Sequence, residues 1–256
     1  MSANPPILVA RKVIAEGMAG TPLADQALDL SLGRGEMICL IGPKATGKTQ
    51  LLRALAGLDP PAAGKVDLLG RRTDGLDEAG WLDLRRRAAF ITADAPLLSV
   101  VDALVNVTLP AMYHGIGDPA TVRQEAQRLL QQLGWHGDMT LLPAFLDEHQ
   151  RRLLALARCL ILKPVVLFVD EPFRMIDVSG WRHFGAVFGG LVRDDQLAVL
   201  MVTHNLPFVR ESGARVVFCG SHGPRVYDSW RTLAGDADPE IGGFLAESGF
   251  NAATVV

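Results

Sequence analysis

The segment 42–49, GPKATGKT, constrains the fold of this chain more than any other feature. It matches the pattern G-x-x-x-x-G-K-[ST] in full, in which glycines permit a tight loop whose backbone N–H groups surround phosphate. Such a loop needs a strand before it and a helix after it, because the helix N-terminus adds free N–H groups. The apolar run EMICLIGP precedes the loop, and Leu51, Leu52, Leu55 and Leu58 follow at helical spacing. The sequence therefore predicts a strand, a phosphate-binding loop and a helix, in this order.

The residues of this loop are the predicted nucleotide ligands. We expect Lys48 to reach the β- and γ-phosphates of a bound nucleotide and Thr49 to offer its hydroxyl to Mg²⁺. An ordinary glycine turn is the alternative, and the flanking strand and helix favour the phosphate loop. The predicted nucleotide-binding residues are Gly42, Pro43, Lys44, Ala45, Thr46, Gly47, Lys48, Thr49 and Gln50.

Polar side chains also follow two further apolar runs. VVLFV ends in Asp170 and Glu171, and LAVLMVTHN places His204 after its last apolar residue. We predict that Asp170 holds Mg²⁺ together with Thr49, and that Glu171 polarises the attacking water as a catalytic residue. Because ligands of open α/β sheets bind at the carboxyl ends of the strands, His204 is the second predicted catalytic residue, in contact with the γ-phosphate. A simple strand end and a structural histidine are the alternatives.

The order of apolar runs and helical patterns predicts an α/β fold. EMICLI, PVVLFVD, LAVLMV and ARVVFCG are continuous apolar runs, which is typical of parallel strands buried on both faces. The middle of the chain differs, because DPATVRQEAQRLLQQLG has a helix start signal at Asp118 and Pro119 and a stop signal at Gly134. We therefore expect a mostly helical insert over about residues 95–160. The first forty residues and GKVDLLGRR are expected to form shorter strands beside the core.

These motifs, in this order, resemble an ABC transporter ATP-binding subunit over nearly the whole chain: the phosphate loop, the helical insert, LFVDEP, Asp177 and VTHN. The resemblance implies a P-loop NTPase with a RecA-like core, a helical subdomain and a small antiparallel β-subdomain, as a single domain over residues 1–256. It implies ATP and Mg²⁺ as cofactors. Within the family, DEPF and the tail DADPEIGGFLAES look most like the ATPase of Mla-type, MCE-associated lipid-transport systems.

The family's signature segment, usually Leu-Ser-Gly-Gly-Gln, closes over the nucleotide of the partner subunit in a dimer. Aligned through the helix LALARCL, this segment is here LDEHQ, residues 146–150. Asp147 and Glu148 would repel a polyanion, and the glycines that permit close backbone approach are absent. Asp147 and Gln150 instead fit a capping box, so we expect the helix to be kept and the phosphate site to be lost. A proton donated by His149 is the alternative that would retain phosphate contact.

Two other positions depart from the family. After the strand AAFI, the family's glutamine is replaced by Ala93, which has no group for a metal or a water; Asp94 would substitute only in a shifted register. The aromatic residue that stacks on adenine is also missing, because the aligned position falls near Ala15 and the chain has no aromatic residue before Trp81.

Together these features predict a subunit that binds Mg-ATP, dimerises and hydrolyses ATP to drive transport through a membrane permease. The subunit would form a homodimer or a heterodimer with another ABC ATPase subunit. Efficient hydrolysis would need a partner with an intact signature, and in a homodimer both sites would lack it. The alternative is a regulatory or structural subunit that binds ATP and hydrolyses it poorly. The resemblance further implies a lipid cargo, an MCE-domain or substrate-binding protein as a further partner, and a cytoplasmic location on the inner face of the membrane.

Composition agrees with this function. The formal net charge of −3 argues against a nucleic-acid partner, and Arg85, Arg86 and Arg87 are expected to be a solvated helix end. Cys39, Cys159 and Cys219 lack metal-binding spacing and are expected to be reduced thiols of the core. The start MSANPP lacks the features of a signal peptide, and no apolar run is expected to cross a membrane.

Overall fold

The computed structural model describes residues 5–15 and 26–250. Residues 1–4, on which the signal-peptide expectation partly rests, and residues 16–25 of the N-terminal strand region lie outside the described part. The strands are β1 Leu8–Ala15, β2 Leu28–Leu32, β3 Met37–Ile41, β4 Pro61–Leu68, β5 Arg71–Arg72, β6 Ala88–Ile91, β7 Val166–Asp170, β8 Ala198–Val202, β9 Arg215–Gly220 and β10 Gly223–Tyr227. The helices are α1 Lys48–Leu55, α2 Glu78–Arg87, α3 Ala103–Tyr113, α4 Pro119–Gln132, α5 Glu148–Leu160, α6 Val178–Arg193, α7 Leu206–Ser212, α8 Trp230–Ala234 and α9 Pro239–Glu247, with short 3-10 turns η1 Thr73–Gly75 and η2 Pro143–Phe145.

A six-stranded sheet forms the centre of the molecule, in the order β10-β9-β3-β8-β7-β6. The strands β9, β3, β8, β7 and β6 are parallel, and β10 pairs antiparallel with β9 at one edge. All residues of β3, β7 and β8 are buried, as their continuous apolar runs predict for strands covered on both faces. The predicted α/β fold with a parallel core sheet is confirmed.

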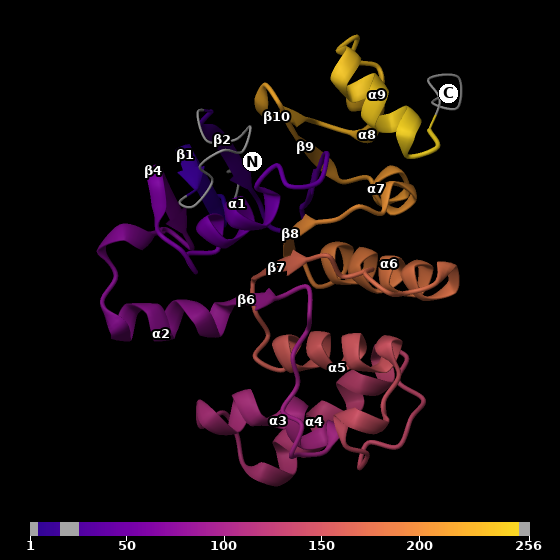
Figure 1. The fold of residues 1–256 in the computed structure, drawn as a ribbon. Helices are drawn as coiled ribbons and strands as arrows, with labels where there is room; N and C mark the ends of the chain where they lie inside the picture. Colours follow the sequence, from indigo (N-terminus) through magenta and orange to yellow (C-terminus); the bar gives the residue numbers. More distant parts are fainter. Residues whose placement is uncertain (1–4, 16–25, 251–256) are drawn as a thin grey trace.

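A second, antiparallel sheet lies beside the first, in the order β2-β1-β4-β5. Figure 1 shows it with α1 between it and the central strands. Leu52 of α1 packs in one apolar cluster with Leu8 of β1 and Leu40 of β3. The small antiparallel sheet expected from the family resemblance is therefore present, and it shares its core with the phosphate-loop helix.

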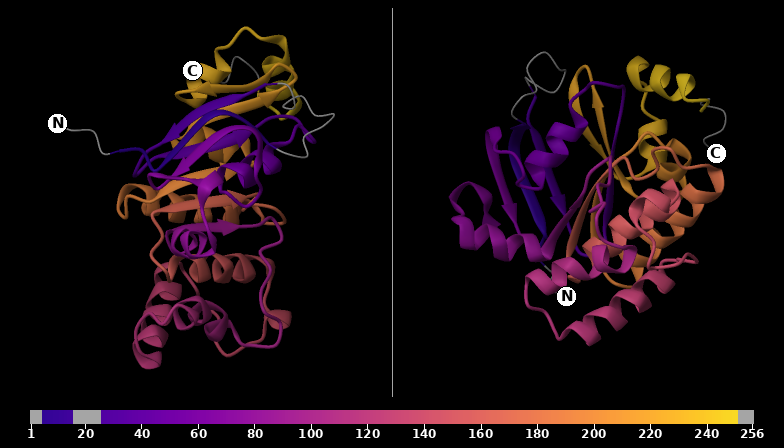
Figure 2. Two further views of the ribbon diagram at one scale, coloured as in Figure 1. Left: turned by 90° about the vertical axis from the view of Figure 1, so that its left-hand side faces the viewer. Right: turned by 60° about the horizontal axis from the view of Figure 1, so that its bottom comes forward.

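The helices α3, α4 and α5 gather at one end of the molecule, opposite α8 and α9 (Figures 1 and 2). Asp118 caps α4 by accepting hydrogen bonds from Ala120 N and Thr121 N, and Gly134 follows the helix with φ of 83°. Both signals that the sequence gives for this helix are thus confirmed. The apolar run 100–110 forms α3, which begins later than that run, at Ala103, and continues past Pro110.

The side chains of β3 alternate between two cores. Ile38 and Leu40 face the cluster shared with α1 and the antiparallel sheet, whereas Cys39 and Ile41 face the cluster shared with α5 and α6. The three cysteines are free thiols, as predicted; Cys39 and Cys219 are buried and Cys159 is half-buried. Arg85, Arg86 and Arg87 end α2 and are exposed, as expected of a solvated helix end. Among the described residues, none of the helices combines the length and apolarity that crossing a membrane requires.

Candidate nucleotide-binding site

The phosphate loop connects the carboxyl end of β3 to α1, and its shape depends on two glycines. Gly42 has φ of 140°, and a Cβ there would lie 2.4 Å from the main-chain oxygen of Cys219 in β9. Gly47 has φ of 91° and is the N-cap of α1. Since L-residues with side chains rarely adopt such conformations, only glycine lets the chain leave β3 close to β9 and enter α1 this tightly.

The N-terminus of α1 is the only α-helix start in the described ranges that lacks a side-chain cap. The other α-helices carry Asp, Asn or Ser at the N-cap, and each accepts a backbone hydrogen bond. At α1 no side chain caps the helix and no acidic residue lies in the first turn. Its first N–H groups and the positive end of the helix dipole are therefore available to an anion.

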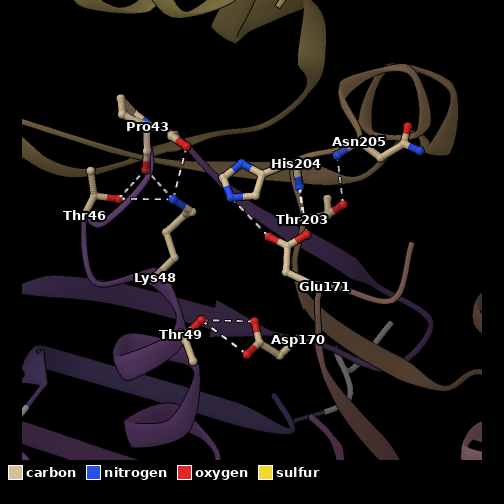
Figure 3. A network of polar contacts seen from close by, with 10 residues as sticks. Pro43, Thr46, Lys48, Thr49, Asp170, Glu171, Thr203, His204 and Asn205 are labelled. Atoms are coloured by element: carbon tan, nitrogen blue, oxygen red, sulfur yellow. Dashed lines mark hydrogen bonds and ion pairs between the residues drawn. The ribbon is translucent and has the colours of Figure 1, made fainter. Parts of the chain in front are cut away.

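Lys48 is buried at the start of α1 and donates to three oxygens of its own loop (Figure 3). Its Nζ lies 3.1 Å from Gly42 O, 2.5 Å from Pro43 O and 3.2 Å from Thr46 Oγ1. An ammonium group has three protons, so these contacts use all of them. Burial lowers the pKa of Lys48 from its ordinary value, against the nearby carboxylates that raise it. A phosphate oxygen that contacts this lysine must replace one of the three acceptors.

Thr49 and Asp170 lie together beneath the loop. Thr49 Oγ1 is 3.1 Å from Asp170 Oδ1 and 3.2 Å from Asp170 Oδ2 (Figure 3). Burial raises the pKa of Asp170, and the hydrogen bond from Thr49 lowers it. Hydroxyl and carboxylate oxygens suit Mg²⁺, which binds through one or two protein groups and completes its shell with water and phosphate. The described residues contain no cluster of three or more His, Cys, Asp or Glu side chains suited to a metal.

Glu171 and His204 face each other where β7 and β8 end. His204 Nε2 lies 3.3 Å from Glu171 Oε1, and the main-chain N–H of His204 donates to Glu171 Oε2 over 3.2 Å (Figure 3). The strands bring them together because β7 and β8 pair in parallel, with Asp170 opposite Val202. Glu171 itself has φ of 46° and donates its N–H to Val202 O over 2.9 Å. This strained conformation turns its side chain out of the sheet and into the site.

The ionisation of this pair is set mainly by burial. Burial, with a smaller contribution from the neighbouring Asp170, raises the pKa of Glu171 from 4.5 to about 7, against the hydrogen bond from His204 N. Burial also lowers the pKa of His204, as do the charges of Lys48 and Lys44. Burial therefore favours the uncharged form of the imidazole and brings the pKa of the carboxyl close to neutral pH. A carboxyl with a pKa near the working pH is suited to general-base chemistry.

The loop and the strand ends surround an open hollow of about 660 Å³. The structure brings together there the loop residues Lys44 to Gln50 and both predicted catalytic residues, Glu171 and His204. The sequence analysis missed five residues that also line the hollow: Phe173, Arg174, Val202, Thr203 and Asn205. Thr203 Oγ1 accepts from Asn205 N over 3.0 Å, and Asn205 caps α7. Their position beside His204 in VTHN was the sequence feature that could have identified them as site residues.

The segment LDEHQ begins α5, and its acids bind groups of their own chain. Asp147 Oδ1 accepts from Gln150 N over 2.8 Å, and Gln150 Oε1 accepts from Asp147 N over 3.1 Å. The predicted capping box is confirmed. Glu148 forms an ion pair with Arg152, which the sequence analysis did not consider. Both acids therefore have partners within the chain, and the expected repulsion of a polyanion at this helix end stays a prediction.

His149 packs against aromatic rings near α6. Its ring centroid lies 5.2 Å from that of Phe184 and 5.3 Å from that of His183. Burial, and secondly His183, lowers the pKa of His149 from 6.5, so at neutral pH the ring is uncharged. This environment disfavours a cationic His149 as a donor to phosphate. Asp177, the aspartate after LFVDEP, caps α6 by accepting from Gly180 N over 2.8 Å.

The other two departures from the family pattern, at Ala93 and Ala15, have the following surroundings. Ala93 follows β6, and the neighbouring Asp94 is 86% exposed and pairs with Arg174, with Arg174 Nη1 3.4 Å from Asp94 Oδ1. Ala15 is buried at the end of β1, where it pairs with Pro61 of β4. Its methyl group is part of the core and is not a platform for a base.

A glycine loop between a parallel strand and a helix, with acids and a histidine at the ends of neighbouring strands, defines a P-loop nucleotide-binding protein. The particular family follows from comparison with known proteins. The ABC transporter family matches residues 26–174, which is more than half of the chain. The chain belongs to the ABC transporter ATP-binding family.

Several relatives support this assignment. The chain is 36% identical over 180 residues to the uncharacterized ABC transporter ATP-binding protein YbbA of Escherichia coli K12, covering 70% of this chain and 78% of YbbA. It is 34% identical over 194 residues to the lipoprotein-releasing system ATP-binding protein LolD of Maricaulis maris, covering 75% of this chain and 84% of LolD. Among solved structures, the dimeric ATP-binding cassette MJ0796 bound to ADP and Pi superimposes with a TM-score of 0.76 at 23% identity, covering 86% of this chain and 97% of that one. This last similarity shows a shared fold.

Proposed function

We propose that this chain binds Mg-ATP at the hollow beside α1 and hydrolyses it to drive a membrane permease, with the signature segment supplied by a partner subunit. The observation that carries this proposal is the Glu171–His204 pair. A carboxyl with a pKa of about 7 stands beside a neutral imidazole at the edge of the phosphate loop. In this site Lys48 and the N–H groups of α1 bind phosphate, and Thr49 and Asp170 hold Mg²⁺. Glu171 accepts the proton of the attacking water, and His204 orients Glu171 and the γ-phosphate.

The permease partner is supported by exposed apolar side chains on and before α3. Val100 is 84% exposed and Tyr113 is 76% exposed, with Leu98, Leu109 and Met112 also exposed. Apolar groups gathered on one element are typical of an interaction surface. We infer that α3 contacts the permease, which keeps the chain on the inner face of the cell membrane. A lipid-class cargo and an MCE-domain partner remain part of the proposal, through DEPF and the tail sequence and through the similarity to LolD.

A second candidate is a subunit that binds ATP and barely hydrolyses it. The observation that favours it is the N-terminus of α5, where Asp147 occupies the helix end that a partner's γ-phosphate would otherwise contact. In a homodimer both signature segments would be of this kind, and hydrolysis would be slow at both sites. In a heterodimer only one site would be affected, and the ATP bound to this chain would meet the partner's intact signature.

The experiment that separates the two candidates is Mg-ATPase activity of the complex that co-purifies with a tagged chain. Wild type and Glu171→Gln are compared, and the isolated chain is assayed alongside. We expect clear turnover in the complex, loss of most of it in Glu171→Gln, and little turnover by the isolated chain. No turnover, or turnover indifferent to the substitution, would support the binding subunit. Robust Glu171-dependent turnover by the isolated homodimer would disprove the need for a partner's signature.

A further inference from the structure

Arg152, in the second turn of α5, is a buried cation with two different partners. Its side chain is 5% exposed. Nε and Nη2 each lie 2.9 Å from Glu148 Oε1, and Nη1 donates to the main-chain oxygen of Glu171 over 3.5 Å, a long hydrogen bond. A buried guanidinium is strongly unfavourable without partners, so both contacts hold it in place. Arg152 therefore bridges the start of α5 and the turn that carries the proposed catalytic glutamate.

The turn at Glu171 depends on such contacts. Its positive φ of 46° is unfavourable for a residue with a side chain, and neighbouring contacts must maintain it. The main-chain oxygen of Glu171 accepts from Arg174 N over 3.2 Å and from Arg152 Nη1. The main-chain N–H of Glu171 donates to Val202 O. The oxygen thus lies toward α5 and the side chain toward His204. A shift of Arg152 changes the support of the main chain from which the Glu171 carboxylate extends.

The other end of the bridge lies on the segment that corresponds to the family's signature. Glu148 is in the first turn of α5, and its side chain is 39% exposed, whereas that of Arg152 is 5% exposed. Only Oε1 of Glu148 contacts Arg152, so Oε2 is not used in this pair. A group that approaches the start of α5 would therefore act on Arg152 through Glu148.

We propose that Glu148 and Arg152 form a positioning pair that links the start of α5 to the main chain of Glu171. A partner subunit that contacts Glu148 at the start of α5 would change how this chain holds its own catalytic glutamate. The inference rests on the proposed function, because it assigns the pair a role at that site. Neither residue touches the reacting atoms; Arg152 acts through the Glu171 oxygen, and Glu148 acts through Arg152.

Hydrogen–deuterium exchange of the full-length chain tests the link without requiring hydrolysis. The probes are the N–H groups of Glu171 and Arg174, both of which are hydrogen-bonded in the structure. We expect Arg152→Gln and Glu148→Gln to raise exchange in this turn by roughly fivefold, because its support is lost. Arg128→Gln is the matched control, since it breaks an exposed Glu125–Arg128 pair on α4 and should leave the turn unchanged.

A charge-reversed double variant, Glu148→Arg with Arg152→Glu, separates positioning from simple stabilisation of α5. It keeps an ion pair but puts an acceptor, in place of a donor, beside the Glu171 oxygen. We expect exchange in the turn to remain raised in this variant and to return toward wild type in Arg152→Lys, which keeps a donor. Full recovery in the reversed pair, or no change in either single variant, would overturn the proposal.

Kinetics of the co-purified complex supply a second readout. We expect Arg152→Gln to lower kcat roughly tenfold with KM for ATP unchanged, because Lys48 and the N–H groups of α1, which bind phosphate in the proposed function, do not belong to this turn. Titration of the wild-type chain with a fluorescent ATP analogue reports the proposed function separately. Lack of binding there would refute the proposed function, and the exchange experiment would still decide whether the link exists. A rise in KM with unchanged kcat would contradict the positioning role.

Discussion

Glu171 couples the stability of the chain to pH. Its pKa is raised by burial from 4.5 to about 7, so the folded state binds its proton more tightly than the unfolded state does. The stability contributed by this proton is fully present below about pH 4.5 and is lost as the pH rises toward about 7. Above this range the protein carries a buried carboxylate whose lost hydration is only partly offset by the hydrogen bond from His204 N.

Glu171→Gln should therefore gain stability relative to wild type as the pH rises. We expect the difference in free energy of unfolding to grow between about pH 5 and pH 7 and to level off above it, with an upper bound of about 3 kcal/mol. Urea unfolding at pH 5 and pH 8 measures the difference. Glu247→Gln, at an exposed position of α9, is the control and should show no such trend. A pH-independent difference for Glu171→Gln would show that the carboxyl titrates normally.

Gly42 is the second residue whose substitution should have a large effect on stability. We expect Gly42→Ala to lower the free energy of unfolding by about 2–4 kcal/mol, from backbone strain and from the contact with Cys219 O, and to abolish ATP binding. Gly70→Ala is the matched control, since Gly70 also has positive φ but its Cβ would meet nothing within 4 Å. The control should lose only about 1–2 kcal/mol. Equal losses in the two variants would contradict the close approach of the phosphate loop to β9.

Among the elements, α1 and α5 differ in what occupies their N-termini. No side chain caps the first N–H groups of α1, whereas at the start of α5 Asp147 accepts from Gln150 N. The start of α5 is therefore stabilised from within the chain and does not need an anion from outside. Restoring the family's serine at this position should be tolerated, because serine is also a good N-cap.

Substitutions at Asp147 test this cap. Asp147→Ala should lower the free energy of unfolding by about 1 kcal/mol, whereas Asp147→Ser should change it by a few tenths, roughly. Urea unfolding measures both, and Asp195→Ala, at an exposed position after α6, serves as the neutral control. A loss for Asp147→Ser as large as for Asp147→Ala would mean that the carboxylate charge, and not the cap hydrogen bond, stabilises α5.

Most of the strands and helix caps that the sequence predicts follow from local residue patterns. The strands around the site follow from continuous apolar runs, and the cap of α5 follows from the spacing of Asp147 and Gln150. The burial of Arg152 could not be predicted in this way, because it depends on α5 packing against a turn that comes 19 residues later. The i,i+4 spacing of Glu148 and Arg152 was the available signal, but most such pairs lie on the surface. The contacts of Lys48 with its own loop could not be predicted either, because the pattern G-x-x-x-x-G-K-[ST] describes how the lysine binds phosphate and not what it contacts without a nucleotide.

For the whole molecule, nucleotide binding should appear as added thermal stability. The site is formed by the phosphate loop after β3 and by residues at the carboxyl ends of β7 and β8. A ligand there therefore stabilises the central sheet and both packed cores together. A ligand at about 100 times its Kd adds about 2.7 kcal/mol. For a chain of this size that amounts to a rise in Tm of roughly 5–10 °C.

We expect Mg-ATP to produce this rise in wild type and EDTA to reduce it, because Thr49 and Asp170 then have no metal to bind. Lys48→Met should abolish the rise, whereas Thr49→Val should abolish only its dependence on Mg²⁺. Differential scanning fluorimetry over a range of ATP concentrations measures these shifts. An undiminished rise in Lys48→Met would place the nucleotide elsewhere on the molecule.

The three hydrogen bonds that Lys48 makes within its loop have a kinetic consequence. If a phosphate oxygen takes the place of Gly42 O, Pro43 O or Thr46 Oγ1, binding includes a rearrangement of the loop whose rate does not depend on the amount of nucleotide. In stopped-flow mixing, the observed association rate should then level off at high ATP concentration. The height of that plateau would be the rate at which the loop releases its lysine.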